Sequence, residues 1–514
     1  MTTSRLNDDC ILYILKFLQN DRSTLFKCLM ANRFLSKITI PLLYANPFER
    51  LKDDKKHLII KTFLSCLNED ETSYLLKLND DYKIPNLNDL IISDVRPIFE
   101  YPKFIKQLLT SEIQSAIGQW TNKYIEKKSI LIYDLLQSLT QVCYHMFLRQ
   151  GVHLNHLEIY PSIFKTELFD HLIIPNLFTL STLTLSTCDD DTSEFKRGNI
   201  SDFLTVIAKN CKSINQLNLK QPEVYNSIEL STIIKRQKEL KEFIFTHSEN
   251  LFKNIFSSLE FQKHSLVTLK FRYVNFHEFI LQSMINLYNL KSLEINSCHG
   301  MTLELCKIFH LASFKLKELI ILGNNWETSI TITIIKYLGI TLQQLRIIKI
   351  TLELMEIISQ YCLNLVTLYI SLEYNINPSI FPYFKNLKIK NLNIMPQYIS
   401  SEDGELKTLD LDKLATNFSK DVIKVSLFSC QFMKKEILSS FLNNCPNHII
   451  TLNLRKKLDT EYLEIILNYI KKKNNNLKFL GFFGLDKILS NEELKMINQI
   501  KEKGIKLVEF NEIL

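Results

Sequence analysis

The sequence predicts an α/β solenoid, in which short parallel strands alternate with helices along most of the chain. An apolar triplet, with the pattern apolar-x-x-apolar-x-apolar, recurs about every 27 residues from Leu154 to the end of the chain. Between the triplets, apolar residues are spaced three and four apart, as at Phe203, Leu204 and Ile207, which is typical of amphipathic helices. One strand and one helix of this size cannot bury their apolar faces alone, so the period indicates a stack of similar units.

This period is typical of leucine-rich repeats, whose units span roughly 20 to 29 residues. We therefore predict a right-handed leucine-rich-repeat solenoid over residues 151–514, shaped as a horseshoe with a parallel sheet on its concave face. The first apolar positions of its roughly 14 repeats are Leu154, Leu180, Ile214, Leu240, Leu266, Leu290, Leu316, Leu345, Leu365, Ile389, Val422, Ile449, Leu477 and Ile505.

Alternation along each triplet separates core residues from surface residues. Leu217 and Leu219 are expected to face the core, while Asn218 and Lys220 face outward on the concave side. Outward cationic and aromatic side chains are the kind that anchor protein partners, although packing or solvation is the alternative for each of them. The candidate substrate-binding residues are Lys220, Lys270, Arg272, Lys349, Tyr369, Phe428, Arg455 and Phe483.

Composition favours a soluble protein of a reducing compartment. Of the 514 residues, 46% are hydrophobic and 23% are charged, and no apolar run approaches the roughly 18 residues that a membrane helix needs. Eleven cysteines occur without any C-x-x-C pair. The net charge of +7 is spread over the chain, and we interpret its one basic cluster, at residues 471–473, as a helix end. We expect a cytoplasmic or nuclear protein with no membrane or nucleic-acid partner.

Six cysteines follow the repeat. Cys188, Cys298 and Cys430 lie three residues after a triplet, Cys211 and Cys362 lie three before one, and Cys445 lies one residue further out. A small apolar side chain with a weak donor suits a buried turn, so we predict that they pack in the core. This placement resembles the cysteine-containing subclass of leucine-rich repeats, which is found in F-box proteins that recruit substrates to ubiquitin ligases.

Two polar insertions interrupt the repeat, at residues 187–198 and 395–411. Insertions in a solenoid often lie on the binding face. Either insertion is interpreted as a binding loop or as a loop without function.

Three short helices are predicted in the first 48 residues. Ile11, Ile14, Leu15 and Leu18 share one helical face, and further helical patterns run from about residue 23 to 33 and from 35 to 44. Helices this short bury little surface alone, so an apolar face among them indicates docking to another surface.

The same segment resembles an F-box. Departures from the family pattern are Asn7 for proline, Asn32 for cysteine, and Leu35 and Tyr44 for tryptophans, and this divergent form looks like a large fungal group of F-box and leucine-rich-repeat proteins. The positions that fit the pattern are Leu6, Asp9, Cys10, Ile11, Ile14, Leu15, Phe17, Leu18, Leu25, Cys28, Arg33, Leu43 and Tyr44.

The resemblance implies that this chain is the substrate-recognition subunit of a cullin-RING (SCF-type) ubiquitin ligase. In that case the F-box-like domain docks on a Skp-type adaptor and the repeats hold a protein substrate. The alternative is a ligase-independent scaffold whose first helices only cap the solenoid. The expected adaptor contacts are Leu6, Ile11, Ile14, Leu15, Leu18 and Leu25.

Residues 49–150 are predicted to be a helical linker and cap, with helices near residues 58–67, 104–114 and 130–148. No catalytic triad, phosphate-binding loop or zinc motif occurs in its required context. His153, His156 and Glu158 form the most metal-like cluster, which we interpret as ordinary surface polarity. We expect no catalytic activity, no metal and no cofactor.

Overall fold

The computed structural model describes most of the chain, and all structural statements below refer to that part. The described residues are 8–19, 21–49, 51, 55–82, 87, 97–125, 132–151, 153–164, 167–169, 177–186, 197–222, 225–248, 253–276, 278–373, 376–396, 399–400, 406–407, 411–428, 433–446, 448–457, 459–472, 476–483 and 489–510. The chain divides into two compact units, Met1–Leu266 (unit 1) and Val267–Leu514 (unit 2).

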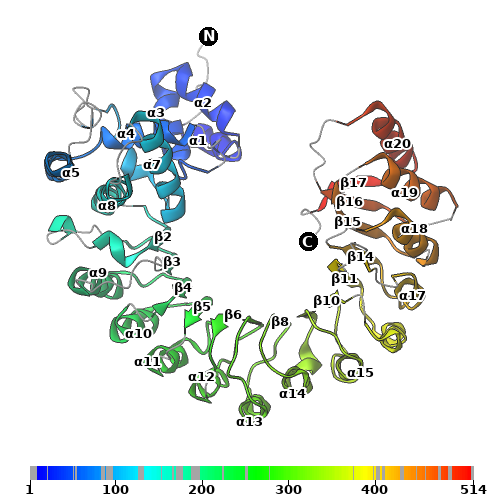
Figure 1. Cartoon of the computed structure of the whole chain (residues 1–514). Coiled ribbons are helices and arrows are strands. Elements are labelled where there is room, and N and C mark those ends of the chain that lie inside the picture. Colours follow the sequence, from blue (N-terminus) through cyan, green and yellow to red (C-terminus); the bar gives the residue numbers. More distant parts are fainter. Residues whose placement is uncertain are drawn as a thin grey trace. The chain divides into compact units, whose positions relative to one another are not determined.

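Unit 1 begins with helices, and strands follow (Figure 1). Polar side chains cap two of the first three helices, because the Oδ1 atoms of Asp21 and Asn32 accept hydrogen bonds from the main-chain N–H groups of Thr24 and Leu35. The helical elements are α1 (Asp8–Phe17), α2 (Arg22–Ala31), α3 (Arg33–Leu43), α4 (Lys56–Leu64), α5 (Glu69–Tyr82), η2 (Tyr101–Phe104), α7 (Thr110–Tyr124) and α8 (Ile132–Gln150).

The helix predicted over residues 104–114 is wrong in its first half. Residues Gln107–Leu108 form strand β1, which pairs in parallel with β2 (His156–Ile159), and α7 begins only at Thr110. Lys106 explains the difference, since its carbonyl accepts hydrogen bonds from the N–H groups of Asn155 and His156. The linker therefore supplies the first strand of the sheet as well as helices.

The rest of unit 1 alternates strands and helices. Strands β1 to β5 pair in parallel in chain order. The elements after β2 are η3 (Pro161–Phe164), η4 (Glu167–Phe169), β3 (Thr182–Leu185), α9 (Arg197–Asn210), β4 (Gln216–Lys220), α10 (Ser227–Arg236), β5 (Glu242–Ser248), α11 (Lys253–Ser258) and η6 (Leu259–Gln262).

Unit 2 continues the alternation, with its strands again parallel and in chain order. The strands are β6 (Thr268–Val274), β7 (Ser292–Asn296), β8 (Glu318–Leu322), β9 (Gln344–Ile347), β10 (Thr367–Leu372), β11 (Asn391–Pro396), β14 (Lys424–Leu427), β15 (Thr451–Lys457), β16 (Phe479–Phe483) and β17 (Lys506–Glu509). The helical elements are α12 (Glu278–Met284), α13 (Leu303–Cys306), η7 (Lys307–Leu311), α14 (Thr328–Leu338), η8 (Gly339–Thr341), α15 (Leu352–Tyr361), η9 (Pro378–Ile380), α16 (Tyr383–Asn386), α17 (Leu411–Thr416), α18 (Lys435–Asn444), α19 (Thr460–Lys472) and α20 (Asn491–Glu502).

In each unit the strands form one layer and the helices form the other, with the apolar core between them (Figure 1). All fourteen residues predicted to open a triplet are buried. The predicted fold class, an α/β leucine-rich-repeat solenoid, is therefore confirmed. No helix in the described ranges combines the length and apolar character needed to cross a bilayer.

Strand pairing departs from the predicted register at two repeats. In the last one, Leu480 pairs with Leu507, whereas a start at Ile505 predicts Val508. The other is the repeat that we started at Leu345. Leu319 pairs with Leu345, so this repeat begins at Leu342, which is fully buried. Ile347, Ile348 and Ile350 make two triplet alignments possible in the sequence, and only the pairing of the strands decides between them.

Candidate functional site

Helices α1 to α3 form a small module with its own core. Leu15, Leu25 and Leu43 are buried at its centre, one from each helix. Partly buried apolar residues surround them, namely Ile11, Leu18, Cys28, Leu29, Leu35, Ile38, Leu42 and Tyr44. The residues that fit the F-box pattern thus contribute much of this core.

The module is attached to the helices that follow it. The Arg22 guanidinium donates hydrogen bonds to the carbonyl oxygens of Asn46 (2.9 Å) and Pro47 (3.2 Å). Tyr44 packs its ring against Phe63 of α4 and against Tyr101, at centroid distances of 6.0 and 4.5 Å. Burial raises the pKa of Tyr44 to about 12, so this ring stays neutral. Tyr44 therefore joins the module to α4 at a position where the F-box pattern has tryptophan.

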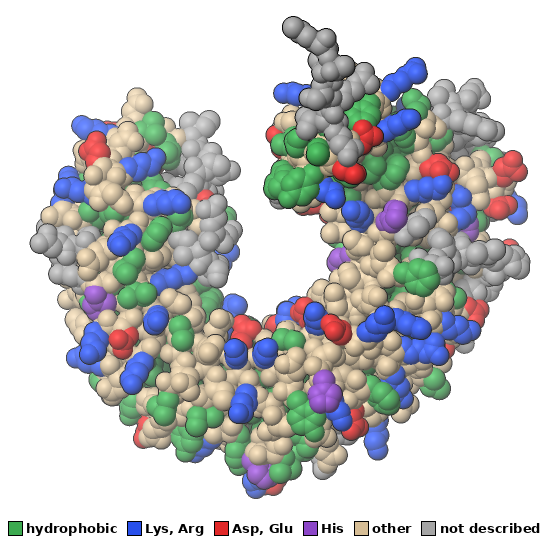
Figure 2. All heavy atoms as spheres, turned by 180° about the vertical axis from the view of Figure 1, so that it is seen from behind, with side chains coloured by type: hydrophobic (Ala, Val, Ile, Leu, Met, Phe, Trp, Pro, Cys, Tyr) green, Lys and Arg blue, Asp and Glu red, His purple; other side chains and the backbone are tan. Residues whose placement is uncertain are grey.

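The outer surface of the module carries exposed apolar side chains from all three helices, which we call the N-terminal apolar patch. Tyr13 and Phe17 lie one turn apart on α1 with their rings 5.0 Å apart, edge to face. Hydrophobic side chains gather on the surface of this end of the chain (Figure 2). The patch consists of Tyr13, Ile14 and Phe17 of α1, Phe26 and Met30 of α2, and Phe34 of α3.

The predicted adaptor contacts divide between this patch and the core. Ile14 is 50% exposed and belongs to the patch. Leu15 and Leu25 are 4% and 1% exposed, and they hold the three helices together from inside. Ile11 and Leu18 are partly buried against that core, and Leu6 lies outside the described residues. The helical spacing of Tyr13 with Phe17, and of Phe26 with Met30, is the signal that would have identified the patch.

Two of the predicted substrate-binding cations are paired with carboxylates on their own sheet face. Lys220 of β4 lies 3.3 Å from Glu158 of β2, whose other carboxylate oxygen accepts a hydrogen bond from the Thr110 N–H. Arg272 of β6 makes a bidentate contact with Glu294 of β7, at 2.7 and 3.1 Å. Lys270 of β6 is in register with Glu294. Charge on these strands is therefore balanced locally.

The remaining candidates lie in the later repeats of unit 2, where three aromatic rings and an arginine meet. Tyr369 of β10 packs against Phe428 at 5.0 Å, and Phe510 packs against Phe428 at 5.1 Å. The Arg346 guanidinium lies 4.1 Å above the Tyr369 ring. Burial raises the pKa of Tyr369, although this arginine opposes the shift. The misplaced repeat at Leu345 hid Arg346, which by register is the outward residue of β9 beside Tyr369.

The structure places Arg455 on β15 and Phe483 on β16, as predicted, and both side chains are exposed. Lys349 does not lie on a strand as predicted, because β9 ends at Ile347. It lies in the connection from β9 to α15, where it lines a pocket. The corrected register accounts for both its position and its exposure.

The cysteines of the repeats pack in the core. Cys211, Cys298, Cys362 and Cys445 are all buried, which confirms the packing prediction for them, while Cys188 and Cys430 lie outside the described residues. Burial raises the pKa of the Cys211 and Cys362 thiols to about 12, so neither is a thiolate nucleophile near neutral pH.

The metal-like cluster does not assemble. Glu158 is engaged by Thr110 and Lys220, and burial lowers the pKa of His156. Over the described ranges, no three or more His, Cys, Asp or Glu side chains are grouped so that they could hold a metal ion.

Residues 187–196 of the first polar insertion lie outside the described residues. In the second insertion, β12 (Ile399–Ser400) and β13 (Leu406–Lys407) form an antiparallel pair, and most of the other residues lie outside the description.

Comparison with known proteins gives distant similarities to solved structures, including the two that follow. No protein-family profile and no curated protein sequence matches the chain. The crystal structure of the Rad7 and Elc1 complex from yeast is similar to it with 16% identity and a TM-score of 0.38, over 68% of this chain and 84% of that chain. The leucine-rich repeat-containing protein LegL7 from Legionella pneumophila is similar with 12% identity and a TM-score of 0.30, over 69% and 91%. At these values the similarities assign no function.

Proposed function

We propose that this chain is the substrate-recognition subunit of a cullin-RING (SCF-type) ubiquitin ligase. In this proposal the N-terminal module binds a Skp-type adaptor, and the strand face of the repeats binds a protein substrate. The chain would act in the cytoplasm or the nucleus, where its free cysteines stay reduced.

The observation that carries the proposal is the N-terminal apolar patch on a module whose own core is already filled. The interior of the module is filled by Leu15, Leu25 and Leu43. The exposed side chains of α1 therefore do not contribute to the core that holds the helices together; these are Tyr13, Ile14 and Phe17. Six large apolar side chains exposed on one small module are typical of a surface that binds a partner. The patch lies on the segment that resembles an F-box, and a repeat array follows it, which is the order that the resemblance implies.

In this proposal the chain acts by bringing the substrate close to the conjugating enzyme, and none of its own residues takes part in the chemical step. A substrate held on the repeats and a conjugating enzyme recruited through the adaptor become reactants within one assembly, which raises their effective concentration. The buried, protonated thiols of Cys211 and Cys362 support a role without nucleophilic catalysis.

Adaptor binding by surface variants tests the proposal. We expect Ile14→Asp and Phe17→Asp to weaken binding of a purified fungal Skp-type adaptor at least about tenfold, because each places a charge in an apolar interface. The control is Phe178→Asp, which changes an exposed aromatic residue of unit 1 outside the patch. Isothermal titration calorimetry on the full chain gives the affinities, and circular dichroism checks that all three variants fold.

Two results would count against this reading. If neither patch variant changes the affinity, the interface lies elsewhere. If the natural chain binds no adaptor while it remains folded, the ligase role fails and a ligase-independent scaffold is favoured.

A further inference from the structure

Six consecutive strands of the sheet in unit 2 contain no acidic residue. Strands β9, β10, β11, β14, β15 and β16 lack Asp and Glu, whereas β7 and β8 contain Glu294 and Glu318. The six strands contain cations at Arg346, Lys424 and Arg455, among others. Their outward face therefore has a positive character that the preceding strands do not share, and we call it the acid-free face.

Three exposed cations on or beside the acid-free face have no carboxylate partner among the described residues. Among the described residues, no carboxylate forms an ion pair with Arg346, Lys349 or Arg455, and all three are exposed. Elsewhere the outward cations Lys220 and Arg272 are both paired. The contrast indicates that the acid-free face has positive charge left for a partner to neutralise.

Aromatic rings lie between these cations. Half-buried Tyr369 of β10 packs on the buried ring of Phe428, which follows β14, and both strands lie between β9 and β15. Phe479 and Phe483 of β16, the strand beyond β15, are exposed. The arginines Arg346 and Arg455 lie on β9 and β15, four strand steps apart, or about 19 Å at the usual strand spacing. An extended peptide of about six residues spans that distance, and its apolar side chains would meet the Tyr369 ring between the two arginines and the β16 rings beyond Arg455.

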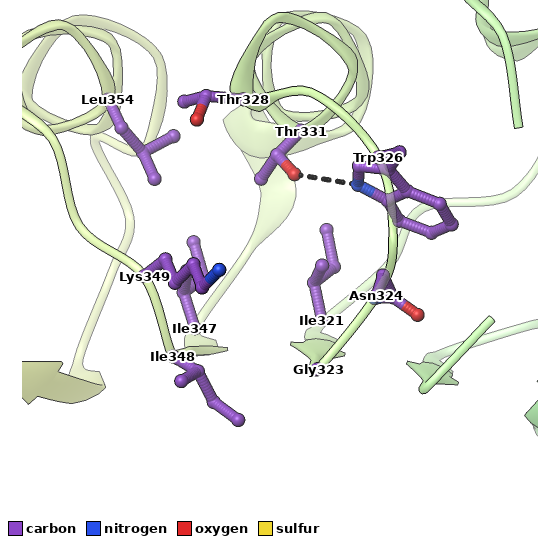
Figure 3. Close-up of a pocket in the computed structure, with 10 residues that line it drawn as sticks. All are labelled: Ile321, Gly323, Asn324, Trp326, Thr328, Thr331, Ile347, Ile348, Lys349 and Leu354. Atoms are coloured by element: carbon purple, nitrogen blue, oxygen red, sulfur yellow. Dashed lines mark hydrogen bonds between the residues drawn. The ribbon is translucent and has the colours of Figure 1, made fainter. Parts of the chain in front are cut away.

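A pocket opens beside the acid-free face, and its lining includes Ile347, the residue that follows Arg346 on β9. It has a volume of about 130 Å³ and lies between the ends of β8 and β9 and the start of α14 (Figure 3). Small-molecule sites usually occupy about 300 to 1,000 Å³, so this pocket suits one side chain. Its lining residues are Ile321, Gly323, Asn324, Trp326, Thr328, Thr331, Ile347, Ile348, Lys349 and Leu354.

The polar groups of the pocket favour an anion. None of the lining residues is acidic, and Lys349 brings an ammonium group to the pocket (Figure 3). Thr328 is the first residue of α14, whose N-terminal end contributes positive potential, while its N-cap residue, Glu327, does not line the pocket and accepts a hydrogen bond from Ser329. The Thr331 hydroxyl accepts a hydrogen bond from the Trp326 indole at 3.1 Å, which leaves its own proton free to donate.

We propose that the acid-free face binds an acidic segment of a protein partner, and that the pocket beside Lys349 receives one acidic side chain of that segment. The inference deepens the proposed function, since it states the class of substrate that the repeats would hold. A protein segment is favoured over nucleic acid because the cations are few and separated by aromatic and amide residues, whereas nucleic acid needs a regular series of phosphate contacts.

Peptide selection on the full chain tests the inference. A phage-displayed library of random 12-residue peptides is selected on the natural chain, on Arg346→Gln/Arg455→Gln, and on the control Lys270→Gln, which removes an outward cation from β6. We expect selected peptides to be enriched in Asp and Glu relative to the unselected library on the natural chain and on the control, but not on the double variant.

The strongest selected peptide is then synthesised with a fluorescent label and measured by anisotropy. We expect the double variant to weaken its binding at least about tenfold and Lys349→Met about fivefold, because interfacial charge pairs are lost, with Lys270→Gln within about twofold. Replacing the acidic residues of the peptide by their amides should weaken binding to the natural chain to the same extent as the double variant.

The inference is overturned if selection yields no acidic enrichment, or if the enrichment persists on the double variant. It is also overturned if a 12-nucleotide poly(U) RNA binds more tightly than the peptide and loses affinity with the same variants, which would assign the face to nucleic acid. Adaptor affinity, measured in parallel, should be unchanged by the three arginine and lysine changes, so failure here is distinguishable from failure of the proposed function.

Discussion

Glu71 joins α5 to α8 through a carboxylate that is fully shielded from solvent. Its two oxygens accept hydrogen bonds from His145 Nδ1 at 2.7 Å and from Arg149 Nε and Nη2, both at 3.0 Å. The same residue forms reciprocal hydrogen bonds with Asn68 at the start of α5. Burial alone would raise the pKa of Glu71, but the hydrogen bonds from His145 and Arg149 outweigh it and lower the pKa.

We expect Glu71→Gln to lower the free energy of unfolding by about 2 kcal/mol, because it removes the fully buried carboxylate that accepts hydrogen bonds from buried His145 and from Arg149, whose side chain is 30% exposed. A carboxylate with a lowered folded-state pKa stabilises the protein above the unfolded pKa, and this contribution is lost as pH falls through the folded value. Urea unfolding at pH 7 and pH 4 gives the test. The difference between variant and natural chain should shrink at the lower pH, and an unchanged difference would contradict the assignment.

The sequence does not reveal which charges are paired. Lys220 and Arg272 look like free concave cations, yet their partners Glu158 and Glu294 are 62 and 22 residues away in the chain. Alternation within a triplet predicts the face of each side chain, but only the pairing of strands places a cation beside a carboxylate. Arg455, by contrast, has no acidic residue on either neighbouring strand, because β14 and β16 lack one.

At the scale of elements, the apolar period predicts the strands and helices well and fails where two patterns overlap. β1 was missed because it has only two residues and depends on main-chain hydrogen bonds from a segment almost 50 residues later, near β2. The sequence predicts the helices of the N-terminal module. It does not predict which apolar side chains of these helices face the core and which face the solvent. Leu15 and Ile14 are neighbours in sequence and differ in burial because three helices share one core.

Substitutions at two adjacent residues of α2 test which side chains lie in the core and which lie on the surface. We expect Leu25→Ala to destabilise the module by about 3 kcal/mol, because a large core side chain is lost, and Phe26→Ala to change its stability by less than about 0.5 kcal/mol. Hydrogen exchange of the amides in α1 to α3 reports the local stability. Equal protection in the two variants would contradict the assignment of Leu25 to the core and of Phe26 to the surface.

At the scale of the whole molecule, the chain carries two candidate binding surfaces of different chemistry, one in each unit. The N-terminal apolar patch is uncharged and offers burial of apolar area, whereas the acid-free face of unit 2 offers unpaired cations. Apolar interfaces are little affected by salt, but contacts between exposed charges weaken as ionic strength rises. The two binding steps should therefore respond differently to salt and to mutation.

Ubiquitin transfer in a reconstituted ligase should require both surfaces at once. With a lysine-bearing fusion of a selected acidic peptide as substrate, we expect Phe17→Asp alone and Arg346→Gln/Arg455→Gln alone each to reduce the initial rate of transfer at least about tenfold. Proximity explains this result, since either change separates the substrate from the recruited conjugating enzyme. Combining the changes should add little further loss when either one already breaks the assembly. Raising the salt concentration from 50 to 500 mM should weaken substrate capture while adaptor binding persists, because the Debye length falls to about 4 Å at the higher value. Transfer that survives the loss of one surface would show that the two do not act in a single receptor.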